Sequence, residues 1–239
     1  VVGSEEDLIH LQTPPYGTSL SITNQIGLQL NHSSKKLFGV NILTLGTEII
    51  SDNIDDEISS YNYLINQKVN SLGSFFQSDW SLTKKINLLS GVRIDKHSML
   101  DDLVFSPRYS LMYHFKKKTQ FRLSYSTGFR APQAFDTDLH IAFAGGGISR
   151  VLLSDNLKEE KSSSVSASIN YDKVAMRYLF GVTLEGFKTV LNNAFYLYPM
   201  GEDEFGELFE KRNGSGATVQ GLTLEIRALY DGLEFESGY

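Results

Sequence analysis

The chain has 239 residues, a formal net charge of −6 and no cysteine, and aromatic residues make up 12% of it. Zero cysteines exclude disulfide frameworks, thiolate metal sites and Cys nucleophiles among these residues. The acidic balance and the lack of a long Lys/Arg block argue against nucleic acid as a partner.

The first residues give no sign of a complete precursor. The chain begins VVGSEEDLIH, with neither an initiator Met nor a basic region before an apolar one. No run of about 18 apolar residues follows, so the sequence predicts no transmembrane helix. We interpret the chain as a piece of a larger precursor.

Alternation of apolar and polar residues recurs along the chain and predicts β-strands. In FSPRYSLMYHF at 105–115, Phe105, Tyr109 and Leu111 fall on one face and Arg108 on the other. Most of the predicted strands exceed the usual five or six residues of soluble proteins and match the roughly nine to eleven that an outer-membrane strand needs. The ten predicted strands are 18–30, 37–50, 70–82, 86–95, 105–115, 119–128, 160–171, 174–187, 217–230 and 233–239.

The connections between these strands alternate between short and long. An up-and-down barrel in an outer membrane has this pattern, with short periplasmic turns and long extracellular loops. A soluble β-sandwich has no reason to collect its long loops at one end. The sequence therefore predicts an all-β fold, an antiparallel up-and-down transmembrane β-barrel. Its long loops are predicted at 51–69, 96–104, 129–159 and 188–216.

In such a barrel the apolar strand faces contact lipid and the polar faces line the lumen. The arginines predicted on polar faces are Arg93, Arg108, Arg122, Arg177 and Arg227. In a barrel they would be paired by lumen acids such as Asp95, Glu185 and Glu225, or by whatever fills the pore. In a soluble sheet the same alternation would make them ordinary solvated positions.

Five sequence pieces carry a resemblance to a known family. In order they are GSFFQSDWSLTKKINLLSGVRID at 73–95, FSPRYSLMYHF at 105–115, FRLSYSTGFRAPQAFDTDLH at 121–140, NLKEEKSSSVSASINY at 156–171 and NGSGATVQGLTLEIRALYDGLEFESGY at 213–239. From about residue 72 onward the chain resembles the β-barrel of TonB-dependent outer-membrane receptors, particularly the kind common in Bacteroidetes. Residues 1–70 match only as generic strands and loops.

The resemblance implies that residues 1–239 form one partial barrel domain, about ten strands of a presumed twenty-two, with the plug domain absent. It implies a ligand-gated importer in the Gram-negative outer membrane, surrounded by lipid and contacting TonB through a plug segment. The substrate would be scarce and large, such as a ferric siderophore, cobalamin, haem or an oligosaccharide. A passive porin or an adhesive outer-membrane barrel is the alternative, and a soluble carbohydrate-binding β-sandwich is a third.

The loop 129–159 contains a possible ligand-binding group. Asp136, Asp138 and His140 stand at alternate positions, which could present three oxygen or nitrogen ligands on one edge to a divalent metal or a metal chelate. An ordinary polar loop has the same composition. We predict no resident metal and no cofactor. We expect the acidic runs at 52–57 and 202–204 to be solvated loops, with calcium binding as the alternative.

The motif GFRAP, formed by Gly128, Phe129, Arg130, Ala131 and Pro132, is predicted to mark the barrel rim. Gly128 would permit a bulge or bend there, and Pro132 would end strand pairing. We interpret the motif as architectural. No nucleophile elbow stands on a strand-to-helix turn, so we do not expect an enzyme.

Overall fold

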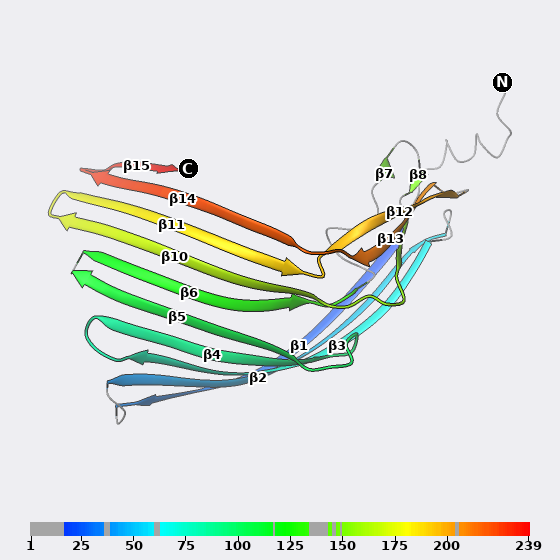
Figure 1. The fold of residues 1–239 in the computed structure, drawn as a ribbon, viewed down its shortest axis with the longest axis horizontal. Helices are drawn as coiled ribbons and strands as arrows, with labels where there is room; N and C mark the ends of the chain where they lie inside the picture. The colour runs from blue at the N-terminus through cyan, green and yellow to red at the C-terminus, as the bar shows by residue number, and fades with distance from the viewer. Residues whose placement is uncertain are drawn as a thin grey trace, which may run out of the picture.

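The fold is dominated by one long curved β-sheet (Figure 1). The computed structural model describes residues 17–35, 39–59, 63–116, 118–133, 143–144, 147–148, 150–203 and 206–239. Among these residues, no helix has the length and apolarity that crossing a membrane requires.

The main sheet has ten strands, and their order in the sheet is their order in the chain, with every neighbouring pair antiparallel. The predicted all-β, up-and-down architecture is therefore confirmed. The strands are β1 (Thr18–Ser34), β2 (Val40–Ile58), β3 (Tyr63–Ser81), β4 (Ile86–His97), β5 (Val104–Lys116), β6 (Thr119–Arg130), β10 (Glu160–Ala175), β11 (Tyr178–Asn192), β14 (Ala217–Tyr230) and β15 (Leu233–Gly238).

Two small sheets lie within segments that the sequence predicted to be loops. β12 (Phe195–Asp203) pairs antiparallel with β13 (Gly206–Asn213), and β13 pairs in parallel with β9 (Arg150–Leu153). We call these three strands the rim sheet. The second small sheet joins β7 (Phe143–Ala144) to β8 (Gly147–Ile148). Figure 1 shows both at the end of the main sheet opposite the tight turns.

The two ends of the main sheet differ in their connections. The turns that follow β5, β10 and β14 are at the end drawn on the left in Figure 1, and the long connections after β6 and β11 are at the other. The predicted loop at 51–69 is wrong, because β2 runs to Ile58 and β3 begins at Tyr63. Residues 52–57 are acidic on both faces of the strand, which hides the alternation, yet their backbones pair with β1 and β3.

The turn predicted at 172–173 is also misplaced. β10 continues to Ala175, and β11 begins at Tyr178. Val174 and Ala175 pair with Leu179 and Tyr178, so the turn consists of residues 176–177. The polar pair Asp172–Lys173 suggested a turn in the sequence but belongs to the strand.

The register gathers apolar and polar side chains on opposite faces of the sheet. Leu111, Leu123, Ala167, Gly186 and Leu222 form one continuous cross-strand row on what we call the apolar face. On the opposite, polar face, hydroxyls pair across strands, as in Ser110 with Ser124 at 2.9 Å and Ser164 with Thr189 at 2.9 Å.

Little of the apolar face is covered by protein. Leu222 is 69% exposed, and the buried hydrophobic residues in the described part of the chain are Ile58, Val69, Val104 and Ala131. A soluble β-sandwich would pack such a face against a second sheet. Among the described residues no second layer covers it. An exposed apolar face on a sheet whose backbone groups are paired is stable in contact with lipid.

Candidate functional site

Four of the five predicted arginines lie on the polar face of the main sheet. Arg93 lies on β4, Arg108 on β5, Arg122 on β6 and Arg227 on β14, each at a polar-face position of the register. Arg177 was expected on the same face of a strand, but it lies in the turn between β10 and β11. Four strands therefore carry positive charge on this face, and Arg177 is outside that set.

Arg93 is held by two carboxylates. Its Nε donates to Asp95 Oδ1 at 2.8 Å, and its Nη2 lies 3.4 Å from Glu48 Oε2. Glu48 also accepts a hydrogen bond from the Gln25 side chain, so the network joins β1, β2 and β4. The Asp95 side chain is only 5% exposed, which makes its charge dependent on Arg93. Asp95 was foreseen as a lumen acid, whereas Glu48 was missed because its strand is distant in sequence.

Between Arg93 and Arg108 the polar face is hollowed into a pocket of about 550 Å³. We call it the wall pocket. Its lining includes Gln77 and the hydroxyls of four serines, Ser106, Ser124, Ser126 and Ser166. Within the described part of the chain Arg108 makes no ion pair, so its guanidinium is available to an anionic or carbonyl group.

The other two arginines make weaker contacts. Arg227 Nη2 lies 3.7 Å from Asp172 Oδ1, and both side chains are about half exposed. Arg122 Nη2 lies 3.7 Å from the Met112 sulfur. The predicted acids Glu185 and Glu225 form no ion pair with any described residue. Exposed pairs of this kind stabilise a protein little, which leaves these charges available to whatever faces the sheet.

The GFRAP segment ends strand β6. The register between β6 and β10 runs without a shift through Gly128 to Arg130, so the bulge expected at Gly128 does not occur. A Cβ at Gly128 would stand 3.3 Å from Ser162 Oγ, and this close approach is what the glycine permits. Pairing stops at Arg130, two residues before Pro132, and both Ala131 and Pro132 are buried. Phe129 is half-buried.

The rim sheet is fastened to this segment by a cluster that we call the rim cluster: Arg130, Gln133, Glu160, Phe195 and Lys211. The guanidinium of Arg130 lies 5.0 Å from the centre of the Phe195 ring and 3.5 Å from Glu160 Oε2. Phe195 N donates to the same carboxylate oxygen at 3.0 Å. Lys211 has no exposed surface, and its Nζ lies 4.6 Å from the Phe195 ring centre.

The predicted ligand group Asp136, Asp138 and His140 lies outside the described residues. In the described part of the chain no group of three or more His, Cys, Asp or Glu side chains could hold a metal ion. The chemistry that the geometry offers is therefore binding by guanidinium, amide and hydroxyl groups, at the wall pocket and above it at the rim.

Comparison with known proteins relates the chain to one family of β-barrels. A family model described as "TonB dependent receptor-like, beta-barrel" matches residues 6–239. The search of curated proteins found no match.

Solved structures with the same fold include three receptors. The siderophore receptor PirA from Pseudomonas aeruginosa is 19% identical with a TM-score of 0.74, over 89% of this chain and 40% of that one. A variant of the ferric enterobactin receptor PfeA from Pseudomonas aeruginosa, in complex with enterobactin, is 19% identical with a TM-score of 0.67, over 93% and 35%. The alcaligin receptor FauA from Bordetella pertussis is 20% identical with a TM-score of 0.60, over 88% and 36%. The chain thus spans less than half the length of the structures it matches.

Proposed function

Since the chain belongs to the TonB-dependent receptor-like β-barrel family, we propose that it forms part of the barrel wall of a ligand-gated importer of ferric siderophores. Barrels of this family lie in the outer membrane of Gram-negative bacteria. The observation that carries the proposal is the ten-stranded antiparallel sheet with an exposed apolar face and a charged polar face. In a closed barrel the apolar face contacts lipid and the polar face, with Arg93, Arg108, Arg122 and Arg227, lines the lumen.

The choice of substrate rests on the similar structures. All three are receptors named for siderophores, which favours a ferric siderophore over the cobalamin, haem or oligosaccharide that the sequence left open. The wall pocket supports this choice because free guanidinium and hydroxyl donors bind anionic chelates. Asp136, Asp138 and His140 remain proposed ligand contacts from an extracellular loop.

The proposal requires parts beyond these strands. A plug domain must occlude the pore, and TonB must contact a segment of that plug, so both belong to the full-length protein as we propose it. A Bacteroidetes-like subgroup, suggested by the motifs, is a further part of the proposal. The family consists of receptors and transporters, not enzymes, and no observation favours the passive porin or the adhesive barrel.

Uptake measurements test the proposed function. A strain lacking the gene should fail to take up radiolabelled iron presented as ferric siderophores, and the full-length gene should restore uptake only where TonB is intact. Growth on haem, cobalamin or oligosaccharides should not depend on the gene. Restored iron uptake without TonB would indicate a passive pore and would contradict the proposal.

A further inference from the structure

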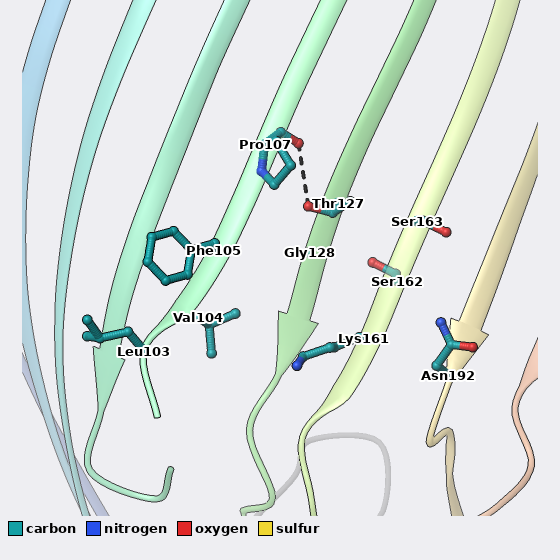
Figure 2. Close-up of a pocket in the computed structure, with 10 residues that line it drawn as sticks. All are labelled: Leu103, Val104, Phe105, Pro107, Thr127, Gly128, Lys161, Ser162, Ser163 and Asn192. Atoms are coloured by element: carbon teal, nitrogen blue, oxygen red, sulfur yellow. Dashed lines mark hydrogen bonds between the residues drawn. The ribbon is translucent and has the colours of Figure 1, made fainter. Parts of the chain in front are cut away.

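A second pocket, of about 430 Å³, lies on the apolar face where that face becomes polar (Figure 2). Its apolar side is formed by Phe105 and Pro107 of β5. Its polar side is formed by Thr127 of β6, Lys161 and Ser163 of β10, and Asn192 of β11. We call it the outer pocket. Figure 2 shows these side chains spread across four neighbouring strands, with Thr127 donating to the Pro107 carbonyl at 3.4 Å.

The register fixes the height of the outer pocket on the sheet. The row immediately below it is exposed and consists of Tyr109, Tyr125 and Val165 on β5, β6 and β10, and it continues with Lys188 on β11. The two tyrosine rings are stacked with centres 6.5 Å apart. Tyrosines of this kind mark the boundary between the hydrocarbon and the head groups around a transmembrane barrel. The outer pocket therefore stands at head-group height on the side that meets lipid.

Two lysines stand on this face near the outer pocket, Lys161 at the pocket and Lys188 in the row immediately below it. Lys161 is paired with Glu159 at 2.7 Å. Lys188, opposite Val165 on the same face, is exposed and makes no contact with a charged group in the described part of the chain. Two ammonium groups and one carboxylate are thus present here, together with hydroxyl and amide donors from Thr127, Ser163 and Asn192. An anion fits this arrangement better than a cation does.

The surface below the pocket is suited to acyl chains. Val165 lies beside Lys188 on the apolar face, and Ile169 and Leu184 lie beneath Lys161 and Lys188; each of the three is between 41% and 49% exposed. One occupant that satisfies both regions has an anionic head and hydrocarbon tails. We propose that the outer pocket, with Lys188 beside it, binds the anionic head group of an outer-leaflet lipid while the tails lie along β10 and β11.

This inference rests on the membrane orientation of the proposed function but not on its substrate. Siderophore uptake and lipid binding are separate measurements, so either can fail alone. Loss of lipid binding with intact uptake would overturn only the outer pocket. Absence of siderophore uptake with intact lipid binding would overturn only the proposed substrate.

The test uses the full-length protein in detergent, with lipid binding followed by native mass spectrometry. The probes are a phosphorylated acyl glycolipid, the same glycolipid without its phosphates, and inorganic phosphate. The wild type should bind the phosphorylated glycolipid, and the double variant Lys161→Gln/Lys188→Gln should bind it about tenfold more weakly. Lys173→Gln is the matched control because it removes an ammonium group from the same apolar face at the other end of β10. This variant should bind the phosphorylated glycolipid normally.

The single variant Lys188→Gln controls for misfolding, because Lys188 makes no hydrogen bond or ion pair with any residue that the structure describes. It should weaken binding by about threefold. Equal binding by the wild type and the double variant would overturn the proposal. Equal binding of the glycolipid without phosphates would also overturn it, and so would full competition by inorganic phosphate, which would indicate a site for free anions.

Discussion

The ammonium group of Lys211 donates a 3.0 Å hydrogen bond to the backbone carbonyl oxygen of Gln133, which is 78 residues away in the sequence. Lys211 belongs to the rim sheet, and Gln133 follows the GFRAP segment at the end of β6. The same ammonium lies over the Phe195 ring. A single buried charge thus links the rim sheet to the end of the main sheet, next to the buried residues Ala131 and Pro132.

The substitution Lys211→Met should loosen this link. Methionine keeps the apolar stem but leaves the Gln133 carbonyl without its donor, a loss of about 1–3 kcal/mol. Hydrogen exchange should accelerate in β9 and β13 while the main sheet stays protected, because local opening follows local contacts. Lys118→Met, at an exposed turn position, is the control and should leave exchange unchanged. Uniform acceleration over both sheets would argue against a local role.

Gly73 and Gly186 form a second matched pair. A Cβ at Gly73 would collide with the Arg93 guanidinium and push it away from Asp95 and Glu48, whereas a Cβ at Gly186 would only reach ordinary contact with Leu222 at 3.6 Å. Gly73→Ala should therefore destabilise the folded protein by about 1–3 kcal/mol. Gly186→Ala should change it by less than about 0.5 kcal/mol. Urea titration of the barrel in detergent measures both, and equal effects would count against the packing described around Arg93.

Arg93 and Arg108 should differ in the same assay. Arg93→Ala leaves the buried Asp95 without its partner and should cost about 1–3 kcal/mol of stability. Arg108 makes no described ion pair, so Arg108→Ala should leave stability within about 0.5 kcal/mol. If the wall pocket serves transport, Arg108→Ala should instead reduce siderophore uptake at an unchanged amount of folded protein. A stability loss for Arg108→Ala would show that its charge is structurally paired.

Neighbouring residues on β6 test the assignment of the two faces. Leu123 lies on the apolar face and Ser124 on the polar face, where its hydroxyl pairs with Ser110. A charge on the lipid side of a barrel at mid-membrane depth costs roughly 2–4 kcal/mol, and the lumen side tolerates it. Leu123→Arg should lower the folded yield in the outer membrane far more than Ser124→Arg does. Equal yields would mean that lipid does not contact the apolar face.

Strands with one apolar and one polar face could be predicted from the sequence. FSPRYSLMYHF was predicted at 105–115, and β5 runs from Val104 to Lys116. The strand prediction failed where both faces of a strand carry polar side chains, as at 52–57. Alternation is then absent, although the backbone pairs normally with the neighbouring strands. Membrane burial produces the alternation, so strand portions beyond the apolar band carry little of this signal.

The rim sheet could not be predicted for a different reason. Its β9 pairs in parallel with β13, which follows more than fifty residues later, and one sequence does not reveal such a pairing. A local signal exists in FYLYPM at 195–200, where aromatic and apolar residues are dense, but a loop was the simpler interpretation. The rim cluster depends on this pairing, so Phe195 and Lys211 were missed, and Arg130 was expected only to be architectural.

The central claim is that the sheet spans the outer membrane with its long connections outside the cell. Asp102, between β4 and β5, and Lys118, between β5 and β6, are exposed at opposite ends of the sheet, and none of the 239 residues is a cysteine. In the full-length protein each is replaced by cysteine, and intact cells are treated with a bulky thiol reagent that cannot cross the outer membrane. Asp102→Cys should be labelled on whole cells, and Lys118→Cys only after the membrane is broken. Labelling of Lys118→Cys alone would invert the barrel, and equal labelling of both in unbroken cells would contradict the membrane assignment itself.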